Sequence, residues 1–126
     1  MGGLRVAEAS IARRSGQADI RSPILMATLF HTTDDDFDRI YTFLYKRSGA
    51  EIADRFTRLI REDAEAVGQA PFARRDGFNF HRGRNGYFLF FEFFEGEANI
   101  YAIFHERERY ADVVADRAEE FWQEFE

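Results

Sequence analysis

The chain has 126 residues and a formal net charge of −6, contains no cysteine, and is rich in aromatic side chains. This length suits one domain that buries about two thirds of its unfolded surface. The missing cysteines exclude disulfides, thiolate metal sites and a cysteine nucleophile. The acidic balance disfavours a general nucleic-acid binder, because proteins that bind phosphate backbones usually carry an excess of Lys and Arg.

Residues 1–22 differ in composition from the rest, since every aromatic residue lies at or after Phe30. We expect a flexible leader or appendage there, followed by a single domain over residues 23–126. The leader lacks the apolar centre of a secretory signal, and no run reaches the ~18 apolar residues of a membrane span. The sequence therefore predicts a cytoplasmic protein without membrane contact.

The first regular element is predicted over residues 24–31, ILMATLFH, a short apolar stretch bounded by Pro23 and two threonines. Its length is typical of a strand. Thr33 precedes three acids at 34–36, which indicates an N-cap followed by carboxylates at the positive end of a helix.

Two amphipathic helices follow. The first carries apolar residues at helical spacing and ends at Gly49, with Phe37, Ile40, Tyr41, Leu44 and Tyr45 on one stripe. The second ends at Gly68 and Pro71, and its stripe consists of Ile52, Phe56, Leu59, Ile60 and Val67. Because the connection is short, the two helices must fold back on each other as a hairpin.

The stretch 72–86 contains two turn signals, Asp76-Gly77 and Asn85-Gly86. Between them, Phe78 and Phe80 alternate with polar residues, which predicts a strand. Residues 86–110, GYFLFFEFFEGEANIYAIFHERERY, then predict a hairpin that turns at 95–97.

The first arm of that hairpin, residues 87–94, places aromatic side chains on both faces of the strand, with Glu92 as its only charge. Both faces therefore need cover. We expect one cover from within the chain and the other from a partner molecule.

Residues 111–125 predict a final amphipathic helix, with Val114, Ala118, Phe121, Trp122 and Phe125 at helical spacing. The predicted order is thus β-α-α-β-β-β-α. This order is an α+β fold in which a helical hairpin packs on a small, mostly antiparallel sheet.

Three stretches resemble the RelE/ParE superfamily of bacterial type II toxins, also called plasmid stabilization proteins. Residues 36–60, DFDRIYTFLYKRSGAEIADRFTRLI, look like the family's helical hairpin, and residues 86–110 look like its strand, turn and closing strand. The ending Ile-Phe-His-Glu-Arg at 103–107 is similar to the Val-Leu-His-x-Arg ending of ParE-like members. The first strand also directly precedes the first helix. The resemblance covers roughly residues 24–112 and favours the ParE-like branch.

The resemblance implies the toxin of a type II toxin–antitoxin system, which acts by binding a protein target. For ParE-like relatives this target is DNA gyrase, and the protein is then a gyrase inhibitor rather than an enzyme, with no cofactor or metal. Charge favours a protein target, because residues 23–126 carry 13 basic and 21 acidic side chains and ribosomal RNA would repel them.

A RelE-like, ribosome-dependent mRNA endoribonuclease without a metal is the alternative. That chemistry is attack of an RNA 2′-hydroxyl on its neighbouring phosphate, which needs a base, an acid and cations. The candidate residues are His105, Tyr110, Arg82, Arg84 and Arg107. The other interpretation of His105 is a purely structural role, in which it caps the strand and pairs with Glu106 or a backbone carbonyl.

The remaining basic side chains admit two interpretations. The arginines bind phosphate or protect a sheet edge from pairing, and edge protection is favoured for Arg74, Arg75, Arg82 and Arg84. We expect His81 to point away from the core and His31 to cap or pack, because no second ligand stands at metal spacing.

Either toxin interpretation predicts a cognate antitoxin, whose helix or strand lies over the exposed sheet face or replaces the final helix. The sequence leaves open whether the chain forms a homodimer through the same surface. A third interpretation is a non-toxic interaction domain that has kept the fold and lost both targets.

Overall fold

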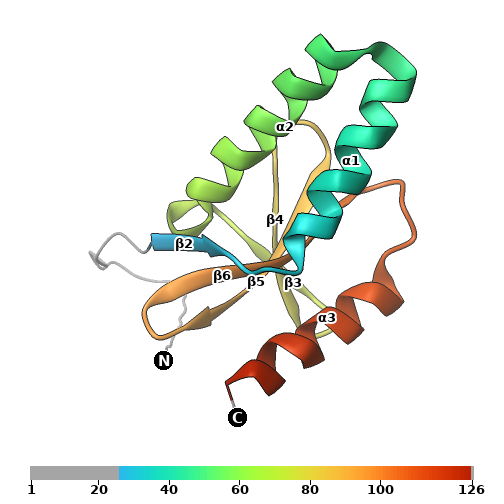
Figure 1. Cartoon of the computed structure of the whole chain (residues 1–126). Helices are drawn as coiled ribbons and strands as arrows, with labels where there is room; N and C mark the ends of the chain where they lie inside the picture. The colour runs from blue at the N-terminus through green and yellow to red at the C-terminus, as the bar shows by residue number, and fades with distance from the viewer. Residues whose placement is uncertain (1–25, 126) are drawn as a thin grey trace.

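The computed structural model describes residues 26–125 and has an α+β fold, as predicted (Figure 1). The leader predicted over residues 1–22 lies outside the described residues. The described elements are β2 (Met26–Leu29), α1 (Thr33–Ser48), α2 (Ala50–Glu65), a short 3-10 helix η1 (Val67–Gln69), β3 (Ala73–Arg75), β4 (Phe78–Arg82), β5 (Tyr87–Phe94), β6 (Glu97–His105) and α3 (Ala111–Glu124). Among these residues, no helix is both long enough and apolar enough to cross a membrane.

The five strands form one sheet in the order β2-β6-β5-β4-β3. Strand β2 is parallel to β6, and the other three pairs are antiparallel. The sheet is therefore mostly antiparallel, as expected. The β5–β6 connection is a tight turn in which Glu95 and Gly96 both have positive φ, which matches the twist of the flanking strands.

Strand β3 is an addition to the predicted order. Asp76 (φ 54°) and Gly77 (φ 85°) form a two-residue turn between β3 and β4. Such a turn requires a strand on each side, and the preceding strand consists of Ala73, Arg74 and Arg75. All three residues are exposed on the edge strand of the sheet, where charged side chains deter pairing with other chains.

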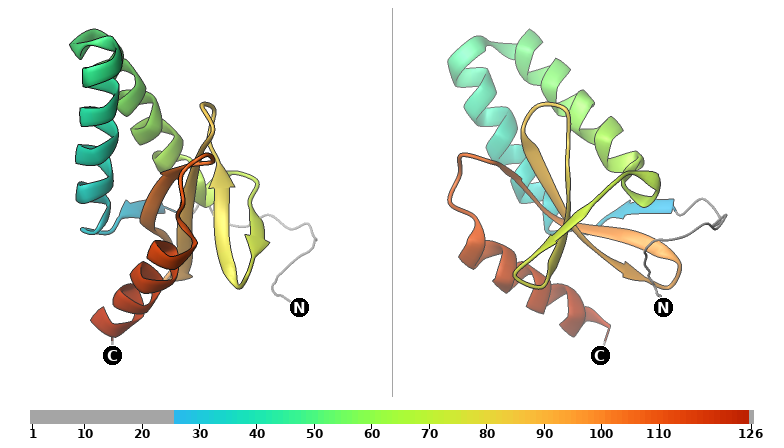
Figure 2. Two further views of the ribbon diagram at one scale, coloured as in Figure 1. Left: turned by 90° about the vertical axis from the view of Figure 1, so that its right-hand side faces the viewer. Right: turned by 180° about the vertical axis from the view of Figure 1, so that it is seen from behind.

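The sheet is covered on both faces (Figures 1 and 2). The helical hairpin of α1 and α2 covers one face, and its core includes Phe37, Ile40, Ile60, Leu89, Phe91, Ile100 and Ile103. Helix α3 covers the other, with Phe90, Tyr101, Ala102, Phe104, Val114, Ala118 and Phe121. The expectation that a partner molecule covers this second face was wrong, because α3 of the same chain packs there.

A β-bulge in β6 directs more side chains towards α3. Phe90 pairs with Ala102 and Phe91 pairs with Ile100, so Tyr101 is an extra residue in β6. Tyr101 and Ala102 consequently both belong to the core under α3. The carbonyl of Tyr101 accepts hydrogen bonds from Thr32 Oγ1 at 2.7 Å and from Arg117 Nη1 at 3.0 Å.

The start of α1 differs from the prediction. The N-cap residue is Thr32 rather than Thr33, and the Thr33 hydroxyl donates to the Phe30 carbonyl at 2.8 Å. Asp34 and Asp35 are exposed in the first helical turn, as expected.

Asp36, in contrast, is fully buried and connects three elements. Its carboxylate accepts hydrogen bonds from Arg39 Nη1 at 2.7 Å, from both Arg117 terminal nitrogens at 2.8 and 2.9 Å, and from the Ile103 N–H at 2.9 Å. The hydrogen bond to Asp36 raises the pKa of Arg117. Asp36 is thus a buried junction of α1, β6 and α3, since each of these elements supplies one of its partners.

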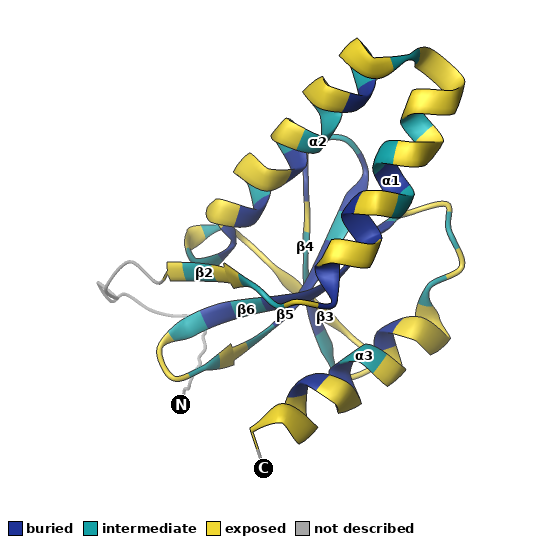
Figure 3. Ribbon diagram, viewed as in Figure 1, coloured by how far each residue is buried: buried dark blue, intermediate teal, exposed yellow. Residues whose placement is uncertain are grey.

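Exposure follows the layers, as Figure 3 shows by its colours. The faces of α1 and α2 that meet the sheet are buried, and their outer faces are exposed. At the far end of the hairpin, large apolar side chains of α1 also stay exposed, with Phe43 at 58 % and Tyr45 at 54 %. The hairpin leaves the sheet as it rises towards the connection between α1 and α2, as the left view of Figure 2 shows.

Candidate functional site

A groove of about 500 Å³ lies between the helical hairpin and the ends of β5 and β6. The α1 and α2 side chains that line it are Arg39, Ile40, Phe43, Leu44, Arg47, Ser48, Ile52 and Phe56. The β4–β5 turn and the end of β6 contribute Asn85, Tyr87, His105, Arg107 and Glu108.

The groove has an apolar wall because the two helices diverge from the sheet. An apolar stripe of side chains runs along the full length of each helix. The sheet buries only the part of each stripe that lies near the base of the hairpin. Phe43, Ile52 and Phe56 extend beyond it and face the groove. The Arg47 guanidinium carbon lies 5.9 Å from the centre of the Phe43 ring.

The polar wall is built around His105, the last residue of β6. Its ring meets the Tyr87 ring edge to face, with centroids 5.0 Å apart. His105 Nδ1 accepts a hydrogen bond from the Arg107 N–H at 3.2 Å, and the Glu108 carboxylate accepts one from the His105 N–H at 2.7 Å. In the neutral ring, Nε2 therefore carries the proton.

Gly86 allows the β4–β5 turn to approach this wall closely. Its φ is +79°, and a Cβ at this position would lie 2.9 Å from Glu106 Oε2 and 3.2 Å from His105 Nε2. The Glu106 N–H also donates to the Gly86 carbonyl at 2.9 Å. Any other residue would be strained here and would displace both side chains.

Asn85, directly before this glycine, has a buried side-chain nitrogen. Its Nδ2 has no hydrogen-bond partner within residues 26–125. Buried amide groups are normally hydrogen-bonded, so this nitrogen, which solvent does not reach, is an exception within the described residues.

Arg39 is held at the base of the groove by several acceptors. It bonds to Asp36, to the Ile103 carbonyl at 2.8 Å, and to Glu108, with Nε–Oε2 at 3.0 Å. Its side chain is one-third exposed. These contacts fix Arg39 in place and neutralise its charge.

Two of the predicted site residues, His105 and Arg107, lie together in the groove. Arg82 and Arg84 do not line it. Arg82 pairs with Glu106 at 3.0 Å, and this hydrogen bond lowers the pKa of Glu106.

Arg84 is bound to α2 instead. It pairs with Asp63 at 2.7 Å and with Glu62 at 3.2 Å, and the hydrogen bond to Asp63 raises the pKa of Arg84. A phosphate would have to compete with these carboxylates for either guanidinium.

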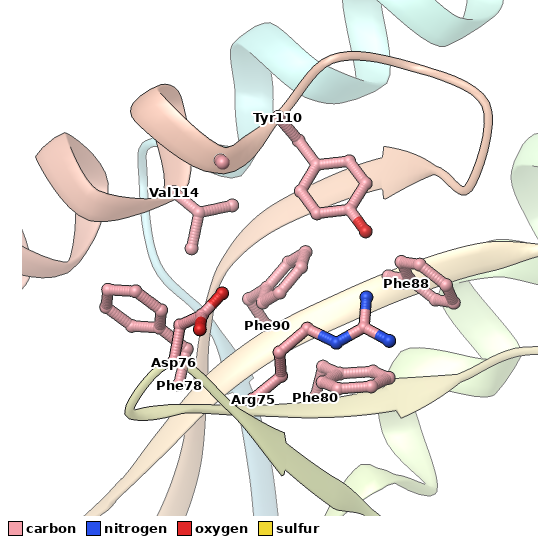
Figure 4. Close-up of a pocket in the computed structure, with 9 residues that line it drawn as sticks. Arg75, Asp76, Phe78, Phe80, Phe88, Phe90, Tyr110 and Val114 are labelled. Atoms are coloured by element: carbon pink, nitrogen blue, oxygen red, sulfur yellow. The ribbon is translucent and has the colours of Figure 1, made fainter.

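Tyr110 lies on the opposite face of the sheet from His105. Its ring contacts Phe88, Phe90 and Phe104, with centroids 5.4–6.2 Å apart. It lines a small pocket of about 40 Å³ between the β3–β4 turn and the start of α3, together with Arg75 and Asp76 (Figure 4). The five candidate residues are therefore divided among four places: His105 and Arg107 lie in the groove, whereas Arg82, Arg84 and Tyr110 each lie elsewhere.

The other histidines are also accounted for. His81 Nδ1 lies 2.7 Å from the Pro71 carbonyl, and His31 Nε2 lies 3.8 Å from Glu124 Oε1. No group of three or more His, Asp or Glu side chains within residues 26–125 is arranged to hold a metal ion.

Three groove residues, Asn85, Arg39 and Glu108, were not predicted from the sequence. Asn85 was interpreted only as a turn residue, and Arg39 lay within a helical stripe defined by its apolar neighbours. A signal was present for Glu108, since it belongs to the charged cluster after His105. That cluster could not show which side chains face the helical hairpin.

No family model matches the chain, and no curated protein matches it.

Proposed function

We propose that the protein acts by binding another protein, as a toxin of the RelE/ParE kind from the ParE-like branch. DNA gyrase is the expected target, and a cognate antitoxin is the expected neutralising partner. The order of the elements supports the resemblance, since a strand, a helical hairpin, an antiparallel meander and a final helix follow one another in both.

The observation that carries this choice is the separation of the candidate nuclease groups. Cleavage by a 2′-hydroxyl needs its base, acid and cations around one phosphate. His105 lies in the groove, whereas Tyr110 packs on the other face of the sheet. Arg82 is occupied by Glu106. This arrangement favours protein binding over RNA cleavage.

Charge supports the same choice. The single domain expected over residues 23–126 carries 21 acidic and 13 basic side chains, which repels RNA at a distance. A protein surface with basic patches is attracted by the same field.

The proposed contact surface is the outer end of α1. Phe43 and Tyr45 are more than half exposed there, and aromatic side chains are over-represented among the residues that dominate binding energies at interfaces. The connection at Gly49 lets the neighbouring helix present its own side chains beside them.

A supercoiling assay with purified gyrase tests the proposal. We expect the full chain to inhibit supercoiling and Tyr45→Ala to raise the half-inhibitory concentration at least tenfold. Val113→Ala is the matched control, because Val113 is a 39 % exposed apolar residue on α3. Unchanged supercoiling at saturating protein would remove gyrase as the target.

Two further measurements separate the alternatives. Cleavage of mRNA in a translation extract, lost in His105→Ala, would favour the endoribonuclease. Growth unaffected by strong expression would favour a non-toxic interaction domain. Co-purification with the product of a neighbouring short reading frame would identify the antitoxin.

A further inference from the structure

We propose that the segment of this chain that precedes Met26, residues 1–25, lies over an exposed aromatic patch at the end of α3. The patch consists of Phe94 of β5, Trp122 of α3 and Phe125, the residue that follows α3. This surface takes no part in the function proposed above. Its exposure, its position beside the start of the described chain and its charge all favour this occupant.

The patch is a cluster of rings that the described residues leave partly open. The centre of the Phe94 ring lies 4.5 Å from that of Phe125 and 5.5 Å from that of Trp122. Trp122 is nevertheless 39 % exposed and Phe125 is 45 % exposed. Large apolar side chains that gather on one part of a surface commonly mark an interaction site.

The described chain begins beside this patch. Met26, Glu97 and Phe94 lie opposite one another on the neighbouring strands β2, β6 and β5. Paired residues point to the same face of a sheet, so Met26 shares the face on which Phe94 packs, and it is 70 % exposed. Two strand spacings, about 10 Å, separate Met26 from Phe94. A segment of 25 residues spans up to ~80 Å, so residues 1–25 are long enough to cross the patch.

The surface around the patch is acidic. Its carboxylates belong to the β5–β6 turn and to the last turns of α3, and they are Glu95, Glu97, Glu119, Glu120 and Glu124. No Lys or Arg within residues 26–125 lies at ion-pair distance from any of them. The one basic residue of α3, Arg117, is paired with the buried Asp36. Charge complementarity therefore favours a basic occupant.

Residues 1–25 have the complementary composition. They carry four arginines, at positions 5, 13, 14 and 21, and only two acids. They also contain aliphatic side chains that can pack on the rings, among them Leu4, Val6, Ile11 and Ile20. Because the segment is joined to Met26, its effective concentration at the patch is high, and weak contacts are enough to hold it there.

Paramagnetic relaxation in NMR spectra of the full chain tests the proposal. The chain contains no cysteine, so Ser15→Cys provides a single site for a nitroxide spin label, directly after two arginines. We expect the label to relax the signals of the three patch residues at least fivefold faster than that of Phe43, at the outer end of α1. Equal relaxation at the patch and at Phe43 would overturn the proposal.

A mixed sample separates the chain's own segment from that of a second copy. Spin-labelled protein is mixed with isotope-enriched protein that carries no spin label, so only contacts between two chains relax the observed signals. We expect no effect on the patch in this mixture. Relaxation of the patch signals there would show that the segment of a second chain covers the patch, and would overturn the intramolecular assignment.

Trp122 reports on the same contact by its fluorescence, because it is the only tryptophan of the chain. Arg13→Glu combined with Arg14→Glu should raise the constant for quenching by acrylamide at least twofold, since the acidic surface repels the reversed charges. Lys46→Glu combined with Arg47→Glu is the matched control, because it makes the same change of charge in the last turn of α1, and it should leave quenching unchanged. Amide proton NMR spectra verify that both variants are folded. Equal quenching in the wild-type protein and both variants would show that charge does not hold the segment on α3, and the proposal would fail.

Discussion

The two faces of the sheet are built from alternate residues of the same strands, yet they are closed to different degrees. Under α3, aromatic rings fill most of the space, and the pocket lined by Tyr110 and Val114 measures only about 40 Å³. Under the helical hairpin, the core is equally buried near β2 but opens into a groove of about 500 Å³.

The difference comes from the geometry of the covering helices rather than from the strands. Helix α3 brings Val114, Ala118 and Phe121 onto the sheet at a spacing that matches one stripe. Helices α1 and α2 also contact each other, and their connection at Gly49 stands away from the sheet. A strand pattern therefore predicts that both faces are covered, but it does not predict how completely.

The largest expected effect concerns the face of the sheet that α3 covers. Phe121→Ala should lower the free energy of unfolding by about 4 kcal/mol, because Phe121 is fully buried and its removal leaves a cavity. Phe56→Ala, on the groove side, should lower it by less than half as much, since Phe56 is only partly buried. Urea denaturation measures both, and equal losses would show that the two faces are equally closed.

The next effect concerns the junction that joins the two faces. Asp36→Ala should lower the free energy of unfolding by about 3 kcal/mol, because it removes the only carboxylate that pairs with Arg117 among residues 26–125 and leaves the buried Ile103 N–H without its acceptor. Asp34→Ala is the control, since Asp34 is exposed in the same helical turn. If both variants unfold at the same urea concentration, the buried network adds no stability.

The third effect depends on pH and on how completely water is excluded from the face of the sheet that α3 covers. Burial raises the pKa of Glu92 to about 7, although nearby Arg74 acts in the opposite direction. The folded protein therefore holds this proton at pH values where the unfolded chain, with a carboxyl pKa of 4.5, has lost it. Stability contributed by the neutral carboxyl should fall by about 2 kcal/mol as the pH rises from 4.5 to 7.

Glu92→Gln isolates this effect. The variant lacks the titrating group, so it should match the wild-type protein near pH 4.5 and exceed it in stability above pH 7. Urea denaturation at several pH values compares the two chains. A constant difference in stability between the two chains across this range would mean that water reaches Glu92. The face under α3 would then be more open to water than its packing indicates.

The sequence predicted the order of elements well, because each long element has a clear period. The helical stripes of 37–45 and 52–67 and the aromatic run of 87–94 led directly to α1, α2 and β5. Strand β3 was missed, since three residues show no period and their two arginines resembled a basic patch.

The site was harder to predict, because it depends on contacts between distant residues. The cover by α3 required knowing that Tyr101 bulges and that Phe121 reaches the same face as Phe90. The separation of His105 from Tyr110 depends on the four residues between them, which carry the chain past the end of β6 to the other face of the sheet. The orphan amide of Asn85 is visible only once its surroundings are known.

The parallel pairing of β2 with β6 sets an order on folding. Met26 lies opposite Glu97 and Leu29 opposite Ile100, so this ladder closes a loop that contains most of the domain. On a ribosome, β2 emerges long before its partner, whereas α1 and α2 contact each other as soon as both are synthesised. Non-local pairing is slow compared with local helix contacts. The helical hairpin is thus expected to form first, and the sheet to close beneath it only after β6 has been synthesised.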